Sequence, residues 1–66
     1  MQIKVNGEIR SIPENTTLLE LIRSLGLETK VMAAAVNMQI VKQDAWSNAA
    51  LHEGDTVELL DFVGGG

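Results

Sequence analysis

Residues 17–27 read Thr17-Leu18-Leu19-Glu20-Leu21-Ile22-Arg23-Ser24-Leu25-Gly26-Leu27, and this segment decides the fold. Thr17, followed three residues later by Glu20, is the signature of a helix-capping box. Gly26 ends the predicted helix, and Leu27 is positioned to fold back on its last turn. A helix of about two turns is not stable alone, so its apolar stripe must pack on a sheet. The stripe recurs at helical spacing and consists of Leu18, Leu21, Ile22 and Leu25.

A β-hairpin is predicted before this helix. Residues 1–5 alternate apolar and polar side chains, as a half-buried strand does, and Asn6-Gly7 then indicates a hairpin turn. A two-residue turn would place Glu8 on the apolar face of the first strand. We therefore expect a three-residue loop through Glu8, which turns Ile9 toward the same face as Val5.

The segment Val31–Val41 permits two interpretations. Ala33-Ala34-Ala35 has high helix propensity, and propensity alone favours a helix through the segment. The turn-like pair Asn37-Met38 and the β-branched pair Ile40-Val41 instead favour two short strands joined by a tight turn.

The connection that follows, residues 42–50, is predicted to contain a turn of helix. Its Trp46 is the single tryptophan of the chain. A large indole in the connection of a small domain is more typical of a satellite packing anchor, outside the main core, than of a binding residue. We therefore expect Trp46 to stabilise the fold.

The last strand is predicted over residues 56–63. Because side chains alternate along a strand, Val57 and Leu59 lie on one face, and Leu60 and Phe62 lie on the other. If the helix covers the first face, the second face is open, and its apolar pair forms a docking surface. The alternative is that a loop covers this pair.

Three glycines, Gly64-Gly65-Gly66, follow the last strand. Without Cβ atoms they can lie extended in a channel too narrow for side chains, and they reach at most about 10 Å beyond the last packed residue. The α-carboxylate of Gly66 is ionised at neutral pH and is able to attack the α-phosphate of ATP, which gives an acyl-adenylate. A glycine terminus is also typical of a chain end that merely frays.

Composition limits the classes of function. The chain has 66 residues, enough for one domain near the lower size limit of a self-sufficient core. It has no cysteine and a solitary histidine, His52, so we expect neither a disulfide nor a zinc site, and the contents suit a reducing cytoplasm. A net charge of -4 and the lack of a long apolar run favour neither nucleic acid nor membrane as a partner.

Motifs spread over the whole chain carry a resemblance to a known family. They are Val5-Asn6-Gly7, Thr17-Leu18-x-Glu20-Leu21, Leu25-Gly26-Leu27, Ala35-Val36-Asn37, Ile40-Val41, Trp46, Gly54-Asp55-x-Val57-Glu58 and Gly65-Gly66. In this order the chain resembles the ubiquitin-like β-grasp sulfur carriers, most closely the ThiS type of thiamine biosynthesis. One departure is Lys42-Gln43, where that family commonly has Pro-Arg, so no partner contact through this arginine is expected.

The resemblance implies an α+β fold, in which a mixed four- to five-stranded sheet packs on one helix. It implies a β-grasp domain over residues 1–63 and a flexible C-terminal glycine tail over residues 64–66. It also decides the open choice for Val31–Val41, because the family has strands there.

In function, the resemblance implies a cytoplasmic sulfur carrier and not an enzyme. An E1-like adenylyltransferase (ThiF-like), using ATP and Mg, would adenylate the Gly66 carboxylate, and the carrier itself would bind no cofactor. A persulfide donor linked to a cysteine desulfurase would then displace AMP and leave a thiocarboxylate. A thiazole synthase (ThiG-like) would take up this sulfur. Gly64 and Gly65 would thread a narrow channel, and the residues expected to dock on partners are Leu60, Phe62 and Val63.

Three alternatives remain at this stage. The molybdopterin-synthase small subunit has the same fold and terminal chemistry, although this chain lacks the paired prolines often found before the glycines in that family. A protein modifier would join Gly66 to a lysine amine. A plain β-grasp interaction module would carry an inert tail.

Overall fold

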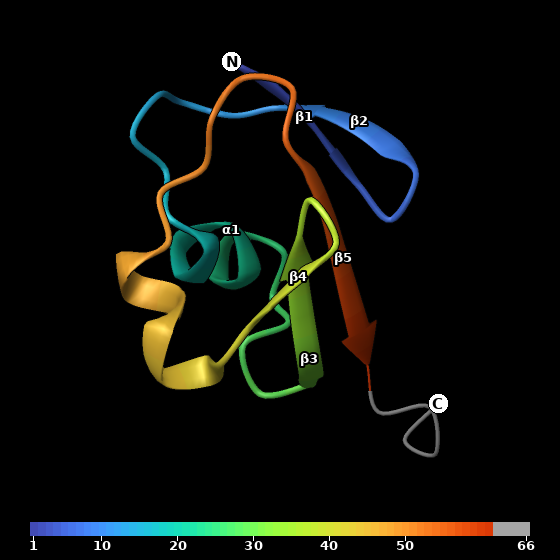
Figure 1. Cartoon of the computed structure of the whole chain (residues 1–66), viewed down its shortest axis with the longest axis vertical. Coiled ribbons are helices and arrows are strands. Elements are labelled where there is room, and N and C mark those ends of the chain that lie inside the picture. Colours follow the sequence, from blue (N-terminus) through green and yellow to red (C-terminus); the bar gives the residue numbers. More distant parts are fainter. Residues whose placement is uncertain (62–66) are drawn as a thin grey trace.

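The computed structural model describes residues 1–61. A sheet with strand order β2-β1-β5-β3-β4 forms the body of the molecule (Figure 1). The central strands β1 and β5 run parallel, and the other neighbours are antiparallel, so the sheet is mixed as predicted. The elements along the chain are β1 (Gln2–Val5), β2 (Glu8–Ser11), α1 (Leu18–Ser24), β3 (Val31–Val36), β4 (Gln39–Val41), the 3-10 helix η1 (Gln43–Asn48) and β5 (Thr56–Asp61).

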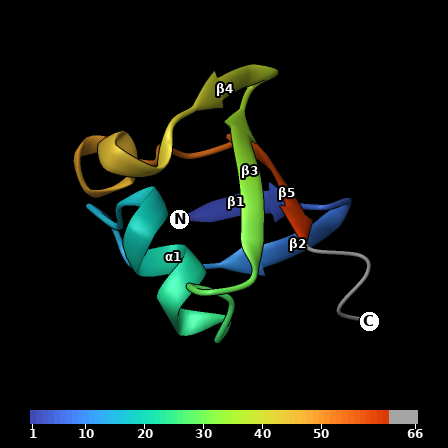
Figure 2. The same ribbon diagram turned by 90° about the horizontal axis from the view of Figure 1, so that it is seen from below.

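One face of the sheet is covered by α1 and η1, which lie on the same side of it in both views (Figures 1 and 2). Leu18, Leu21 and Ile22 of the predicted apolar stripe are buried there, as their spacing predicts. Leu25, the C-cap residue, is partly buried against the same core. We call this covered side the inner face and the opposite side the outer face. The core between the sheet and the two helices consists of Ile3, Val5, Leu18, Leu21, Ile22, Val31, Ala34, Trp46, Leu51, Val57 and Leu59.

Both ends of α1 are capped as the sequence predicts. The Glu20 amide donates to the Thr17 hydroxyl at 3.2 Å, and the Thr17 amide donates to the Glu20 carboxylate at 2.9 Å, which completes the capping box. At the other end Gly26 has φ +71°, and the Leu27 amide donates to the Ile22 carbonyl at 3.1 Å in the Schellman manner. Local sequence therefore fixes the length of this short helix.

The prediction of a three-residue loop in the first hairpin is wrong. Val5 pairs with Glu8, and the two intervening residues, Asn6 and Gly7, have φ of +48° and +87°, as a type I′ turn requires. Ile9 consequently pairs with Lys4 on the outer face and is 68% exposed. The expectation assumed that the second strand has a buried side, but β2 is an edge strand that is exposed along its whole length.

The segment Val31–Val41 forms the strands β3 and β4, so the choice made from the resemblance is confirmed. Asn37 and Met38 make the second two-residue turn of this kind, with φ of +51° and +69°. The high helix propensity of the alanines is overridden because β3 pairs with β5 along most of its length.

Trp46 is a packing residue, as predicted, but the expectation that it lies in a satellite cluster is wrong. It lies in η1, is 2% exposed, and its indole Nε1–H donates to the Val41 carbonyl at 2.9 Å. It belongs to the main core and so does more than anchor a peripheral loop.

Within residues 1–61, no helix is long and apolar enough to cross a membrane.

The predicted glycine tail, residues 64–66, lies outside the described residues, as do Phe62 and Val63. The predicted domain boundary at residue 63 lies in the same segment.

Candidate functional site

The strand that leads to the chain end, β5, has one buried and one exposed row of side chains. Val57 and Leu59 are 0% and 7% exposed on the inner face, where they belong to the core. Glu58 and Leu60 alternate with them on the outer face, and Leu60 is 55% exposed. The structure therefore leaves Leu60 accessible, as a docking residue requires, and no described segment covers it. The docking role itself remains a prediction.

A shallow apolar hollow of about 350 Å3 adjoins Leu60 on the outer face. Two alanines of β3 form its floor, because Ala33 pairs with Leu60 of β5 and Ala35 pairs with Ile40 of β4. Paired residues point to the same face of the sheet, so the larger side chains of Leu60 and Ile40 border the small methyl groups. This hollow is lined by Asn6, Ala33, Ala34, Ala35, Ile40, Glu58, Leu59 and Leu60.

Sequence reasoning missed most of the apolar side chains that the molecule exposes. Ile40 borders the hollow, and Met32 lies in β3 at the irregularity of its pairing with β5. The β-branched pair Ile40-Val41 predicts a strand, but only the register of the strands shows that Ile40 faces the same side of the sheet as Leu60. Among residues 1–61 the exposed large apolar side chains are Ile9, Met32, Met38, Ile40 and Leu60.

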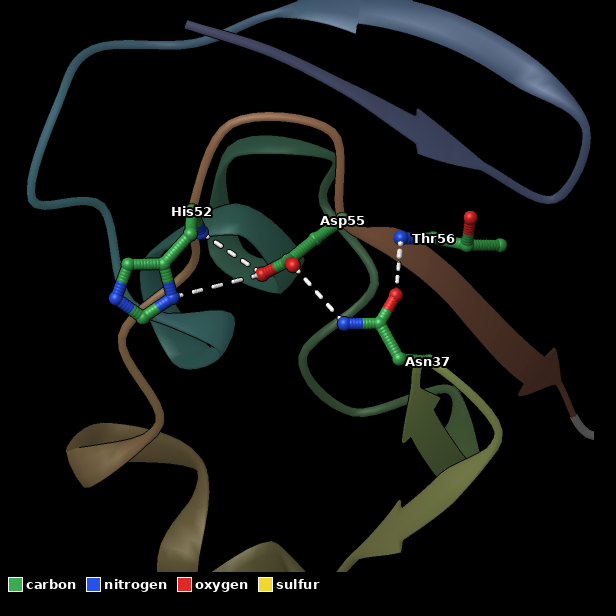
Figure 3. A network of polar contacts seen from close by, with 4 residues as sticks. All are labelled: Asn37, His52, Asp55 and Thr56. Atoms are coloured by element: carbon green, nitrogen blue, oxygen red, sulfur yellow. Dashed lines mark hydrogen bonds and ion pairs between the residues drawn. The ribbon is translucent and has the colours of Figure 1, made fainter.

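A polar network fixes the start of β5, at the end of the strand away from Asp61 (Figure 3). The buried Asp55 carboxylate accepts a hydrogen bond from Asn37 Nδ2 at 2.9 Å and one from the His52 amide at 2.8 Å. The His52 ring is exposed, with Nδ1 3.8 Å from the same carboxylate. The Thr56 amide donates to Asn37 Oδ1 at 2.9 Å. These contacts hold the β3–β4 turn against β5, which is a structural role.

Residues 1–61 contain no candidate metal centre. No group of three or more His, Cys, Asp or Glu side chains gathers there in a way that could hold a metal ion. The remaining predicted site residues, Phe62, Val63, Gly64, Gly65 and Gly66, lie outside the described residues.

Comparison with known proteins identifies the family. The model of the ThiS family matches residues 3–66, which is nearly the whole chain. The chain belongs to the ThiS family. The sulfur carrier protein ThiS of Escherichia coli is 30% identical, and the match covers 100% of both chains. A crystal structure of the thiamine biosynthesis protein ThiS from Geobacter metallireducens superposes with a TM-score of 0.82 at 28% identity, again over 100% of both chains.

These matches confirm the predicted resemblance and the ubiquitin-like β-grasp fold of ThiS proteins. Other relatives are longer. A thiazole synthase of Paramagnetospirillum magneticum is 32% identical over 66 residues, which is 100% of this chain but 20% of that protein. The chain spans the same share, 20%, of a second thiazole synthase, from Magnetococcus marinus.

Proposed function

We propose that this ThiS-family chain is a sulfur carrier in thiamine biosynthesis, and that it carries sulfur as a thiocarboxylate on Gly66. The observation that supports the proposal most strongly is that the family match extends to Gly66 itself. A relative named as a sulfur carrier protein ThiS also aligns over its whole length. In this role the chain is a substrate of other enzymes and catalyses nothing itself.

The proposed chemistry takes place in two stages. An oxygen of the Gly66 carboxylate attacks the α-phosphorus of ATP, and pyrophosphate leaves, so that an acyl-adenylate forms. The terminal sulfur of a persulfide then attacks the acyl carbon and displaces AMP, and a second thiol cleaves the resulting disulfide to release the thiocarboxylate. ATP and Mg belong to an E1-like adenylyltransferase, ThiF-like in kind, and the persulfide originates on a cysteine desulfurase. The carrier holds no cofactor of its own.

Within this scheme the sheet and the tail have different tasks. The outer face of the sheet supplies an apolar contact for a partner. This contact consists of Leu60 and the adjoining hollow, which contains Ala33 and Ala35. Phe62 and Val63 are assigned to docking on the same partner in this proposal. Gly64 and Gly65 keep the final segment slender enough to enter an active site. The net charge of -4 favours partners that present a basic face.

A thiazole synthase, ThiG-like in kind, is the proposed recipient of the sulfur. Two proteins named as thiazole synthases contain a segment similar to the whole of this chain. A carrier segment within the same polypeptide would be held at high effective concentration near the synthase, and a separate carrier would meet the same need by docking. The family match favours this recipient over molybdopterin synthase, and favours carriage over protein modification or an inert interaction module.

The deciding experiment is the intact mass of the protein isolated from its native host without thiol-reactive reagents. The expected result is a species that ends at Gly66 in which one oxygen is replaced by sulfur, and which reverts on hydrolysis. The test also shows directly whether Gly66 carries the free carboxylate in the cell. Absence of this species, even when an adenylating partner, ATP and a persulfide donor are supplied, would contradict the proposal.

Gly65→Ala tests the role of the glycines. The added Cβ should slow adenylation, because it obstructs a narrow channel, while the thermal unfolding curve stays unchanged. Leu60, Phe62 and Val63 are intact in this variant, so partner affinity should persist. Wild-type adenylation of Gly65→Ala would contradict the channel argument and leave the carrier role standing.

A further inference from the structure

The parallel pairing of β1 with β5 ends before β5 does. The Lys4 amide donates to the Asp55 carbonyl, and the Asn6 amide donates to the Val57 carbonyl, both at 2.9 Å. At the turn formed by Asn6 and Gly7 the chain then reverses into β2, which pairs with β1 and not with β5. No residue of β1 is therefore left to pair with the backbone of β5 beyond Val57 on this side.

The Asn6 side chain takes the place of the missing strand. The Leu59 amide donates to Asn6 Oδ1 at 2.8 Å, and Asn6 Nδ2 donates to the Leu59 carbonyl at 3.2 Å. In a regular parallel ladder these same two backbone groups of Leu59 would be bonded by the next residues of β1. The carboxamide supplies one acceptor and one donor, so it continues the ladder past the point where the main chain turns away.

The two hydrogen bonds of the Asn6 carboxamide hold the second half of β5, the part that leads to the C-terminal glycines in the sequence. On its other side β5 is paired with β3 as far as Asp61. Without the carboxamide, the stretch from Leu59 to Asp61 would be held from one side only, and its edge would be free to bend. We infer that Asn6 is a positioning residue for the carrier reaction, because it fixes the direction in which β5 delivers the tail and its terminal carboxylate. This inference rests on the proposed function.

A second asparagine provides a matched comparison within the same molecule. Asn37 also begins a two-residue turn with positive φ, and its carboxamide also makes two hydrogen bonds near β5. Those bonds reach Asp55 and Thr56, at the start of the strand. The two asparagines thus have equivalent turn conformations, and each carboxamide makes two hydrogen bonds, one set at the start of β5 and the other in its second half.

The matched variants are Asn6→Gly and Asn37→Gly. Glycine adopts positive φ without strain, so each variant preserves its turn and removes only the carboxamide. Asn6→Asp is a conservative third variant, since it tolerates the same backbone conformation and keeps an acceptor for the Leu59 amide but loses the donor.

The first measurement is amide hydrogen exchange by NMR on the full chain. In Asn6→Gly the Leu59 amide should exchange about tenfold faster relative to the amides of α1, because it loses its acceptor while the core stays closed. In Asn37→Gly this ratio should stay at the wild-type value. If all amides accelerate together in Asn6→Gly, the carboxamide only stabilises the fold, and the inference is wrong.

The second measurement is ATP–pyrophosphate exchange with the adenylyltransferase of the same host. Asn6→Gly should lower kcat at least about tenfold with little change in KM, because the tail is misdirected while the outer face still docks. Asn6→Asp should fall between Asn6→Gly and wild type, and Asn37→Gly should match wild type. If wild type is not adenylated, the proposed function fails and the inference fails with it. If wild type is adenylated and Asn6→Gly reacts like Asn37→Gly, the inference alone is overturned.

Discussion

Leu59 and Leu60 are the same residue at adjacent positions of β5, yet they belong to different parts of the molecule. Leu59 is 7% exposed and joins the core beneath α1, whereas Leu60 is 55% exposed beside the hollow of the outer face. The alternation of a single strand thus separates residues that hold the fold from residues that remain available to a partner. Stability and partner binding should therefore respond to different substitutions.

The largest expected effect comes from truncating the buried leucine. Leu59→Ala removes core volume and should cost about 2–5 kcal/mol of the free energy of unfolding, measured by urea denaturation. A loss of this size is a large fraction of the stability of so small a domain. The control is Leu60→Ala, which should cost less than about 0.5 kcal/mol because its side chain is already half in water. Equal losses in the two variants would contradict the division of β5 into two faces.

A second, smaller effect is expected at η1, which closes the inner face. Trp46→Phe leaves a void and removes the donor to the Val41 carbonyl, so we expect a loss of about 1–3 kcal/mol in the same denaturation assay. Adenylation at a temperature where the variant is fully folded should match wild type. A defect in partner affinity without a loss of stability would instead make Trp46 a binding residue.

The helix cap of α1 should contribute less than either core residue. Thr17→Ala removes the hydroxyl that accepts from the Glu20 amide, and should cost about 1 kcal/mol. Glu20→Gln is the control, because its amide oxygen can still accept from the Thr17 backbone amide. The two midpoints of denaturation should therefore differ. If they coincide, α1 depends on its buried stripe alone and the cap adds nothing.

The elements that the sequence predicted correctly are those specified by nearby residues. The start, stripe and end of α1 depend on side chains within one short segment, from Thr17 to Leu27, and each feature is present in the structure. The first hairpin was mispredicted because its register was inferred from burying Ile9, and burial depends on the rest of the sheet. Nothing within β2 reveals that it lies at an edge beyond the cover of the helices.

The same distinction applies to the candidate site. Alternation along β5 alone predicts that Leu60 and Leu59 face opposite sides. The hollow requires the register of three strands, and the bonds between Asn6 and Leu59 join residues 53 positions apart. In the sequence, the hairpin turn alone accounts for an asparagine at position 6. Its hydrogen bonds to β5 therefore could not be predicted from the sequence.

The smallest effect on stability, and the sharpest test of the outer face, is expected from Leu60. Leu60→Ser should change the free energy of unfolding by less than about 0.5 kcal/mol but weaken binding to the adenylyltransferase about tenfold, which calorimetry can measure. Ile9→Ser is the matched control, because Ile9 is exposed on the same face but lies on the edge strand β2, away from the hollow. If Ile9→Ser weakens binding equally, the partner contacts the outer face broadly. If only Leu60→Ser does so, contact is concentrated beside the strand that leads to Gly66, where a partner must lie to receive the tail.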